Sequence, residues 1–442
     1  MARETTAYVL ATAQEHDVRF IRLWFTDILG SLKSFAITVD ELETALDDGV
    51  AFDGSSIEGF ARSDESDMIA RPDPGTFVVL PWRPHEDRVA RMICDITWPD
   101  GRPFEGDPRY VLRRTLQRAR ALGYTFYVGP ELEYFYFRGA TDPEPLDAGG
   151  YFDLTPLDAA SDLRRETVLT LEEMGISVAS SHHEVAPSQH EIGLRHTDAL
   201  TMADNTMTYR LVVKEVALKH DVYASFMPKP LSNVNGSGMH AHQSLFHGEI
   251  NAFFDEDGPA RLSQVAQRYI AGLLRHAPEL TLLCNQWVNS YKRLRPGFEA
   301  PAYLTWARRN HSDLIRIPEA VPGRPEAARV EYRAADPACN PYFAFSALLA
   351  AGLQGIQQEY PLPPETVDDV SLLGEEERRA RNVERLPGTM GEAIELFARS
   401  ELMRATLGTH VFESFLRNKR IEWDAYLGQV TDFERERYLP VL

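Results

Sequence analysis

Apolar positions recur at every second residue in some parts of the chain and every three to four residues in others, which predicts a mixture of strands and helices. The predicted strands of the longer, C-terminal part cover residues 126–138, 176–193, 222–228, 237–246 and 329–333. The predicted helices between them cover residues 161–174, 198–220, 263–276 and 341–357. Helix and strand patterns also mix before residue 104, so we expect an α+β protein.

The composition and the turn residues indicate two domains. A chain of 442 residues is too long for one ordinary hydrophobic core, and its 44% hydrophobic and 25% charged residues are typical of a folded globular protein. A segment rich in turn residues ends at Asp107 and Pro108, and proline is favoured just inside a helix start. The predicted domains are therefore residues 1–104 and 105–442.

The net charge and the cysteines exclude several classes of protein. A charge of −20 argues against a nucleic-acid partner, because phosphate backbones require a basic face. The three cysteines lie far apart, which predicts no disulfide framework or zinc finger and fits a reducing cytoplasm. No apolar run approaches the ~18 residues of a membrane span, and the N-terminus lacks a signal-peptide pattern. We expect a cytoplasmic protein without a membrane partner.

Acidic side chains and histidines recur at alternate positions of the predicted strands, where residues two apart share one face of a sheet. The candidate metal ligands are Glu131, Glu133, Glu184, Glu191, His240 and Glu331. These carboxylates and one imidazole suit two divalent cations with about three protein ligands each. Because the set is rich in oxygen and contains no Cys, it favours Mg²⁺ or Mn²⁺ over Zn²⁺. For any single Glu, the alternative is a buried salt bridge to an arginine.

Basic residues and flexible loops accompany this acidic set. Arg293 lies in the loop NSYKRLRPGFEAP, which also carries Glu299, and further arginines follow at Arg316, Arg329 and Arg333. Cations beside metal-binding carboxylates are typical of phosphoryl-transfer sites, whereas solvated loop charges are the alternative. The chain has no P-loop and no Rossmann glycine motif.

Two glycine-containing loops complete the candidate chemistry. In NGSGMHAH, Asn235 offers an amide and Gly236 permits a close backbone approach to a ligand, although an Asn-Gly pair is also a common hairpin turn. In DGSSIEGF, Asp53 and Ser56 lie on a loop where a carboxylate is able to bind a cation or accept a proton. An ordinary Asp-Gly turn is the alternative there.

These residues stand in motifs that resemble the class I bacterial glutamine synthetase family, from residue 3 to the end of the chain. The motifs are FDGSSIEGF, ESDM, PELEYF, HHEVA..QHEI, NGSGMHAHQSLF, NSYKRL.PGFEAP and RVEYR..DPACNPY. The resemblance implies a small β-grasp-like N-terminal domain and a large catalytic domain, in which helices surround an antiparallel β-strand funnel. It also implies a dodecamer of two hexameric rings, with each active site between the catalytic domain of one subunit and the N-terminal domain of its neighbour.

The resemblance assigns roles to individual residues. It implies that Glu133, Glu184 and Glu191 bind one metal ion and that Glu131, His240 and Glu331 bind a second. The implied glutamate-binding residues are Asn235, Gly236, Arg293 and Arg333, and the implied ATP-binding residues are His242, Ser244, Arg316 and Arg329. The implied ammonium pocket consists of Asp53, Ser56, Tyr151 and Glu184. The implied catalytic residues are Asp53, Glu299, Arg293 and Arg333.

The implied reaction joins ammonia to L-glutamate with ATP as co-substrate. ATP phosphorylates the γ-carboxylate, because an unactivated carboxylate has no adequate leaving group. Asp53 then takes a proton from ammonium, and ammonia attacks the γ-glutamyl phosphate while Glu299 shields that intermediate from water. The first alternative is a γ-glutamyl-amine ligase that uses a polyamine, ethanolamine or an alkylamine, which the retained Asp53 disfavours. The second is a catalytically weak regulatory homologue.

The chain departs from the family pattern near the expected site. His311 stands in place of an Arg, so we expect weaker acyl-phosphate stabilisation and an activity that falls as pH rises through the histidine range. Arg295 stands in place of Val, where it either restores some charge or is solvated. Ser188 stands in place of Gly and is expected to alter the hairpin that carries the Glu184 and Glu191 ligands.

Two further positions bear on regulation. Glu384 stands where adenylylated relatives carry Tyr, so that modification is expected to be absent. Arg62 matches an arginine that is linked to feedback inhibition in the unadenylylated subgroup, which makes inhibition by glutamine a hypothesis.

Overall fold

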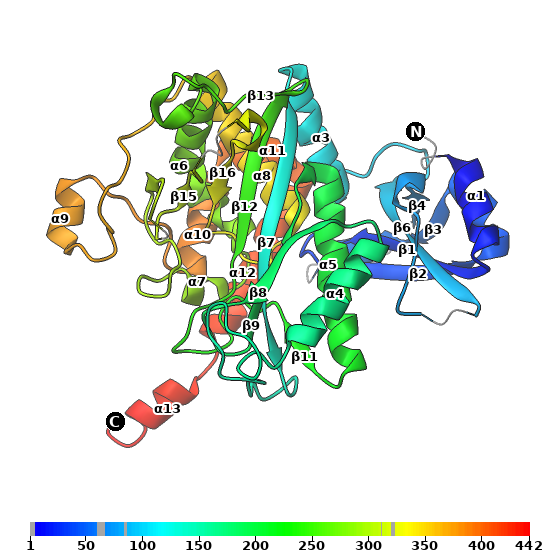
Figure 1. Cartoon of the computed structure of the whole chain (residues 1–442), viewed down its shortest axis with the longest axis horizontal. Coiled ribbons are helices and arrows are strands. Elements are labelled where there is room, and N and C mark those ends of the chain that lie inside the picture. The colour runs from blue at the N-terminus through cyan, green and yellow to red at the C-terminus, as the bar shows by residue number, and fades with distance from the viewer. Residues whose placement is uncertain (1–4, 60–66, 84–85, 311, 320–322) are drawn as a thin grey trace.

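The structure is a computed structural model that describes residues 5–59, 67–83, 86–310, 312–319 and 323–442. The predictions made for Arg62 and His311 therefore fall outside the described residues. Figure 1 shows a small N-terminal domain at one end of the molecule, a larger domain built around long strands, and a C-terminal helix that projects from the larger domain. In the described ranges, no helix has the length and apolar character needed to cross a membrane.

The N-terminal domain is a mixed sheet with two short helices. Its strands are β1 (Val18–Thr26), β2 (Leu32–Thr38), β3 (Val50–Asp53), β4 (Asp67–Pro72), β5 (Val78–Val79) and β6 (Arg88–Thr97). The order is β2-β1-β6-β4-β3, with β5 also paired to β6, and β1 runs parallel to β6. The helices are α1 (Thr6–Glu15) and α2 (Leu42–Asp48), and the short 3₁₀ turns are η2 (Val39–Glu41), η3 (Gly54–Ile57) and η4 (Pro74–Thr76).

The N-terminal domain begins with a hairpin, in which β1 and β2 pair antiparallel around Asp27 and Gly30. The Asp27 carboxylate accepts the backbone N–H groups of Leu29 and Ser31 at 3.0 and 2.8 Å. Gly30 has a φ of +78°, a left-handed conformation that glycine adopts without strain.

The large domain is built on a single sheet of long and short strands. These are β7 (Thr125–Phe137), β8 (Val178–His183), β9 (Gln189–Leu194), β10 (Thr197–Asp198), β11 (Tyr223–Ser225), β12 (Met239–His247), β13 (Ile250–Asn251), β14 (Trp306–Ala307), β15 (Ile315–Arg316) and β16 (Val330–Tyr332). The main order is β14-β15-β16-β12-β7-β9-β8, and within the described residues the pairs are antiparallel apart from β14 with β15. The expected antiparallel sheet is therefore present.

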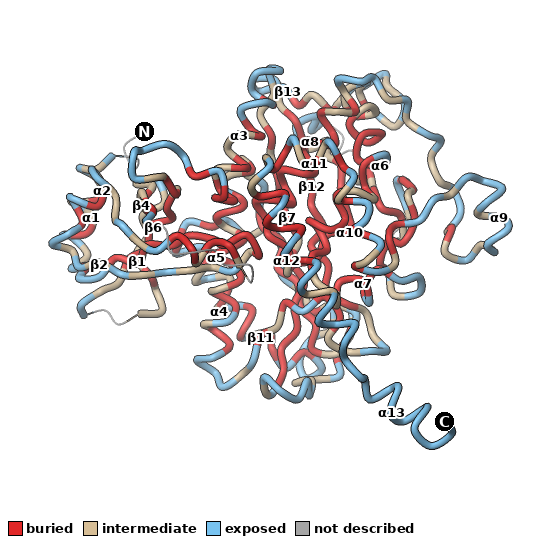
Figure 2. The backbone as a smooth tube through the Cα atoms, turned by 180° about the vertical axis from the view of Figure 1, so that it is seen from behind, coloured by how far each residue is buried: buried red, intermediate tan, exposed pale blue. Residues whose placement is uncertain are grey.

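The helices of the large domain pack around this sheet, apart from α9 and α13, which project from it (Figure 1). They are α3 (Pro108–Ala121), α4 (Ser161–Glu173), α5 (Ala199–Lys219), α6 (Gln264–Cys284), α7 (Ser290–Arg293), α8 (Pro341–Gln357), α9 (Glu375–Ala380), α10 (Met390–Ala398), α11 (Glu401–Leu407), α12 (Thr409–Leu427) and α13 (Asp432–Tyr438), with 3₁₀ turns η5 (Pro259–Arg261) and η6 (Pro325–Ala327). Figure 2 shows that buried residues concentrate along β7, β12 and α8, so the core includes both the sheet and α8.

Three sequence-based predictions of elements need correction. Residues 176–193, predicted as one strand, form the two antiparallel strands β8 and β9. Helix α6 continues past the predicted end at 276 to Cys284 although it contains Pro278, because its last turns carry the fully buried Leu280 and Leu283. Between residues 359 and 388, where the turn-forming and acidic residues favour a loop, the structure contains the short helix α9. Acidic residues in the first turn of α9 and arginines in its last favour this helix through its dipole.

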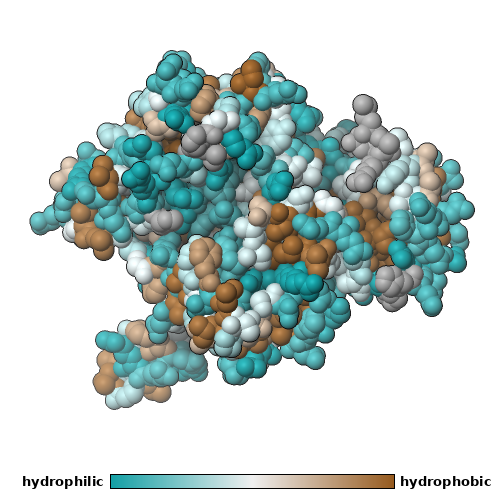
Figure 3. Space-filling model, in the orientation of Figure 1, coloured by the Kyte–Doolittle hydropathy of each residue, from teal (hydrophilic) through white to brown (hydrophobic). Residues whose placement is uncertain are grey.

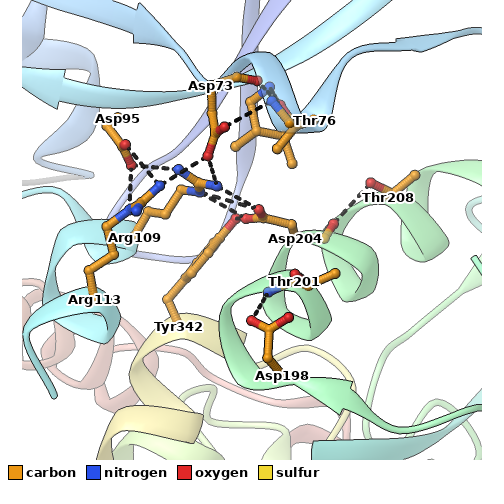
Figure 4. A network of polar contacts seen from close by, with 12 residues as sticks. Asp73, Thr76, Asp95, Arg109, Arg113, Asp198, Thr201, Asp204, Thr208 and Tyr342 are labelled. Atoms are coloured by element: carbon orange, nitrogen blue, oxygen red, sulfur yellow. Dashed lines mark hydrogen bonds and ion pairs between the residues drawn. The ribbon is translucent and has the colours of Figure 1, made fainter. Parts of the chain in front are cut away.

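A buried network of ion pairs joins the two domains (Figure 4). The Arg109 guanidinium, in α3, lies 2.8 Å from Asp73 and 2.6 Å from Asp95, both in the N-terminal domain. The same guanidinium lies 2.8 Å from Asp204 in α5, and the Tyr342 hydroxyl of α8 donates to Asp204 at 2.7 Å. The position of the N-terminal domain is thus set by side chains from three helices of the large domain.

Candidate active site

The pairing register of the large sheet brings the predicted ligands together. The directly opposed pairs are His240 with Glu131, Glu133 with Glu191, and His242 with Glu331. Because opposed residues on neighbouring strands point to the same face, their side chains converge on one side of the sheet. Glu184 directly follows β8, whose pairing with β9 sets it beside Glu191.

These side chains open into a cavity of about 1000 Å³. The candidate residues that line it are Glu131, Glu133, Tyr151, Glu184, Glu191, Asn235, Gly236, His240, Arg293, Glu299, Arg316 and Arg333. A second cavity of about 230 Å³ is lined by His242, Ser244 and Arg329 and shares Glu131 and Ser180 with the first. The two cavities therefore meet at the strand position of Glu131.

Buried carboxylates on the β7–β9 side lack enough positive charge. Burial, and next the nearby Glu184, raise the pKa of Glu133 to about 8. Burial, followed by the charges of Glu131 and Glu133, also raises the pKa of Glu191 well above its ordinary value. A divalent cation relieves such repulsion directly, so this donor set fits a hard metal ion.

The carboxylates on the β12–β16 side are already paired with cationic or hydrogen-bonding groups. Burial opposes ionisation of Glu131, but hydrogen bonds from His240 and His242 outweigh it and lower the pKa of Glu131. Glu331 lies 2.5 Å from both Arg316 and Arg333. The charges of His242, and next of Arg333, His240 and Arg316, overcome the effect of burial and lower the pKa of Glu331 to about 2. Glu331 thus has the arginine partners that the salt-bridge alternative describes, and its role as a metal ligand stays a prediction.

Three groups of side chains on this face bring metal-ligating atoms within 4.8 Å of one another. They are Glu131 with Glu191 and His240, Glu131 with His242 and Glu331, and His182 with Glu184 and Glu191. The structure thus gathers the predicted ligands, whereas their division into the two implied sets of three remains a prediction.

Two residues of this site were missed in the sequence analysis. His182 Nε2 lies 2.8 Å from Glu184 Oε1 and 3.9 Å from Glu191 Oε1. Gln189 is buried and donates from Nε2 to Glu133 Oε2 at 2.9 Å and to the Gly236 carbonyl at 3.1 Å. The strand period offered a signal for His182, which is two residues from Glu184. For Gln189, its place in the motif HHEVA..QHEI beside Glu191 could have indicated that it belongs to the site.

Arg293 is held rigidly at the floor of the larger cavity. Its guanidinium donates to the backbone carbonyls of Ala334 at 2.7 Å and Arg333 at 3.1 Å. A Cβ atom at Gly238 would lie 2.4 Å from Arg293 Nη2, so the glycine is needed for this close approach. Asn235 Nδ2 donates to Glu299 Oε2 at 2.9 Å, so the side chain expected to shield the intermediate is held at the edge of this cavity.

Several predicted residues lie away from this cavity. Asp53 and Ser56 are in the N-terminal domain and line neither cavity, and Asp53 accepts hydrogen bonds from the Ser55 backbone and hydroxyl at 3.0 and 2.8 Å. Arg295 is exposed and also lines neither cavity, which favours the solvated alternative for its charge. The site within one chain therefore contains the metal, amino-acid and nucleotide candidates but not Asp53.

A face of converging carboxylates and arginines between two adjoining cavities defines a metal-dependent phosphoryl-transfer enzyme. Comparison with protein families makes this specific. Residues 17–99 match the model of the glutamine synthetase beta-Grasp domain, and residues 105–438 match that of the glutamine synthetase catalytic domain. The chain belongs to the glutamine synthetase family. It is an ATP-dependent ligase that forms glutamine from glutamate and ammonia.

Individual relatives agree with this placement. The chain is 54% identical to glutamine synthetase of Mycolicibacterium smegmatis and 50% identical to that of Methanosarcina mazei, and both alignments cover 98% of the chain and at least 97% of the relative. Among solved structures, a GmaS/ADP complex has a TM-score of 0.88 at 30% identity, covering 98% of this chain and 99% of that one. Plasmodium falciparum glutamine synthetase has a TM-score of 0.88 at 25% identity, with 98% of each chain covered.

Proposed function

We propose that the larger cavity binds glutamate and ammonium and the smaller cavity binds ATP, with phosphoryl transfer where they meet. The observation that carries this assignment is that Glu131 lines both cavities, so a nucleotide phosphate in one reaches a carboxylate in the other. The ADP-bound state of the GmaS relative supports a nucleotide in this fold. His242, Ser244 and Arg329 are the proposed nucleotide contacts.

Two Mg²⁺ or Mn²⁺ ions are the proposed cofactors. Glu133, Glu184 and Glu191 would hold one ion, and Glu131, His240 and Glu331 would hold the other. The raised pKa values of Glu133 and Glu191 support the first set, since these carboxylates gain the most from a neighbouring cation. When bound, such ions neutralise phosphate charge and orient the reacting oxygens.

The basic side chains stabilise the charge that moves during transfer. Arg333 and Arg316 line the larger cavity beside Glu331 and provide the proposed contacts to the migrating phosphoryl group. Arg293, Asn235 and Gly236 are proposed to bind the glutamate substrate. Arg293 suits this role because backbone carbonyls already fix its guanidinium, so little side-chain entropy is lost on binding.

The ammonium pocket requires a second subunit in this proposal. Tyr151 and Glu184 line the cavity, while Asp53 and Ser56 of a neighbouring subunit complete the pocket and Asp53 accepts the proton of ammonium. The loop that carries Glu299 is proposed to close over the γ-glutamyl phosphate. A dodecamer of two hexameric rings is the proposed assembly. Exposed apolar residues at the projecting C-terminus support assembly through this segment (Figure 3), namely Val430, Phe433, Leu439, Val441 and Leu442.

We assign residues 1–104 to the N-terminal domain and residues 105–442 to the catalytic domain, and we place the enzyme in the cytoplasm. Proteolysis of the purified protein tests the first, because a domain boundary near residue 104 is expected to be a preferred cleavage region.

A phosphate-release assay with ATP, Mg²⁺ and glutamate tests the choice of acceptor. Turnover with ammonium supports the assignment, whereas turnover with methylamine, ethanolamine or a polyamine but not with ammonium contradicts it. The 54% identity to a glutamine synthetase favours ammonium.

Subunit complementation tests the shared site. Asp53→Ala and Glu131→Gln are each expected to be inactive as homo-oligomers. When co-expressed in equal amounts, they are expected to restore activity at up to about one quarter of the sites, because that fraction combines an intact Asp53 from one subunit with an intact Glu131 from its neighbour. Separately purified and unmixed oligomers are the control. Absence of any recovery would place both residues in one subunit's site.

A further inference from the structure

Ser188 lies at the turn between β8 and β9 in a backbone conformation that serine rarely adopts. Its φ is +56°, in the left-handed region that favours glycine, and its side chain is fully buried. A non-glycine residue in this region costs about 1–2 kcal/mol and persists when surrounding contacts compensate for it. The contacts of the serine hydroxyl therefore indicate what the residue does.

Ser188 and Asp147 hold each other through reciprocal hydrogen bonds. Ser188 Oγ accepts the backbone N–H groups of Leu146 and Asp147 at 2.5 and 3.0 Å. In return, the Asp147 carboxylate accepts the Ser188 backbone N–H at 2.8 Å. Its Oδ1 atom also lies 3.1 Å from His183 Nε2, and Oδ2 accepts the Ala159 N–H at 3.0 Å. This arrangement, here called the Ser188 clamp, joins both ends of the 146–160 loop to the hairpin.

The clamp brings the middle of the 146–160 loop against β8. The Phe152 N–H donates to the His183 carbonyl at 3.1 Å. A Cβ atom at Gly149 would lie 2.8 Å from His183 Nε2, so the loop backbone presses directly on that imidazole. The loop is therefore seated on the strand that leads to the Glu184 ligand.

The seated loop carries the aromatic wall of the larger cavity. Tyr151 and Phe152 both line this cavity although more than half of each side chain is exposed, so few contacts of their own fix them. Their rings pack edge-on to His182 at centroid distances of 5.5 and 4.9 Å, and His182 Nε2 lies 2.8 Å from Glu184. The distance from the aromatic wall to Glu184 thus depends on how firmly the loop is anchored.

We propose that Ser188 is a positioning residue that sets the size of the amine pocket by clamping the Tyr151–Phe152 wall over Glu184. This inference rests on the proposed ammonium pocket. A firmly seated wall favours ammonium, because a small cation needs close partners and a larger amine needs the wall to move. Loss of the Ser188 hydroxyl leaves two loop N–H groups without their acceptor and frees the wall.

Two substitutions separate the hydroxyl from the backbone conformation. Ser188→Ala removes the hydroxyl and keeps the left-handed strain, whereas Ser188→Gly removes both. Both variants are expected to raise KM for ammonium about 10-fold, which corresponds to the loss of a buried hydrogen bond, and to lower the preference for ammonium over methylamine. KM for ATP is expected to stay within about twofold, since the nucleotide cavity does not include the loop. Ser346→Ala, which removes an equally buried hydroxyl in α8, is the matched control.

Hydrogen exchange measures the clamp without using activity. The amides of Leu146 and Asp147 are expected to exchange faster in both Ser188 variants and unchanged in Ser346→Ala. Should Ser188→Ala fail to fold, Ser188→Gly carries the test, because glycine accepts the φ of +56°.

The outcomes are distinct. An unchanged ammonium KM in both Ser188 variants overturns the proposal, and so does a parallel rise in the KM for ammonium and for ATP, which would mean that the whole hairpin had shifted. If the native enzyme turns over no ammonium, the proposed function fails. The clamp is then judged by hydrogen exchange, where faster exchange in both variants supports it and unchanged exchange overturns it.

Discussion

Glu133 is a buried carboxylate that lies near the charge of Glu184 and accepts hydrogen bonds from Gln189 and the Gly238 N–H. Burial, and next Glu184, raise its pKa to about 8 from an ordinary value of 4.5. The folded protein therefore binds more protons than the unfolded chain between these pH values. The free energy of unfolding consequently falls as pH rises through this window. This destabilisation is the electrostatic cost of a site arranged for cations.

We expect chelator-treated protein to lose on the order of a few kcal/mol of stability between about pH 4.5 and pH 8 because of this carboxyl. In Glu133→Gln, the free energy of unfolding is expected to fall less steeply with pH. The stabilisation by added Mn²⁺ is expected to be much smaller than in the native protein. Urea unfolding at several pH values, with and without Mn²⁺, measures both. An identical slope in the native protein and Glu133→Gln would contradict the assignment of the charge to this site.

The Ser188 clamp shows how one substitution in a motif acts through a neighbouring loop. The expectation that Ser188 alters the hairpin is not visible as a loss of pairing, because β8 and β9 remain in register from His182 opposite Glu191 to His183 opposite His190. The serine instead directs its hydroxyl at the 146–160 loop. Its effect is therefore expected on substrate preference rather than on the strands.

Helices α6 and α8 pack closely through glycines. A Cβ atom at Gly355 of α8 would lie 2.1 Å from the Arg268 carbonyl oxygen and 2.7 Å from Gly272 Cα of α6. A Cβ atom at Gly272 would in turn lie 2.2 Å from the Ala351 carbonyl oxygen. Backbone on both sides leaves no flexible side chain to move, so this contact fixes the distance between the two helices.

Gly355→Ala is accordingly expected to destabilise the protein by about 1–3 kcal/mol through overpacking, despite the higher helix propensity of alanine. Gly139→Ala is the control, since a Cβ atom there meets no heavy atom within 4 Å. The urea midpoints of the two variants compare them directly. If Gly355→Ala were as stable as Gly139→Ala, the close approach of α6 and α8 would be disproved.

The junction between the domains depends on one guanidinium. Arg109 is almost fully buried and contacts the carboxylates of Asp73, Asp95 and Asp204. Arg113 contacts Asp73 and Asp95 as well, but about a third of its side chain is exposed. Because the proposed ammonium pocket combines the N-terminal domain of one subunit with the catalytic domain of another, this junction also orients Asp53 toward the neighbouring site.

Arg109→Met is expected to cost about 3–5 kcal/mol, because it leaves the buried Asp204 carboxylate without its guanidinium partner. Arg113→Met removes a more exposed partner of two of the same carboxylates and is expected to cost about 1 kcal/mol or less. Thermal and urea unfolding measure both values. Equal losses in the two variants would mean that burial of Arg109 adds nothing to the junction.

Much of the site could be predicted from local patterns. The strand period predicts that Glu131 and Glu133 share a face, and the structure places both in one cavity. Helix signals such as Pro108 were sufficient for α3, whose N-cap is Asp107. Signals of this kind act over a few residues, so they survive any tertiary arrangement. The end of α6 was predicted wrongly because burial of its last turns overrides the local effect of Pro278.

The sequence by itself determined the α+β class, most strands and helices, and the residue types of a cation- and phosphate-binding site, because periodicity and motif chemistry are local properties. Only the tertiary structure decided that His240 faces Glu131, that Glu331 lies between Arg316 and Arg333, and that Asp53 lies away from its own chain's cavity. Those facts depend on pairing register and domain packing between segments far apart in the chain. The shift in the pKa of Glu133 follows from the same packing, since burial and a neighbouring charge produce it.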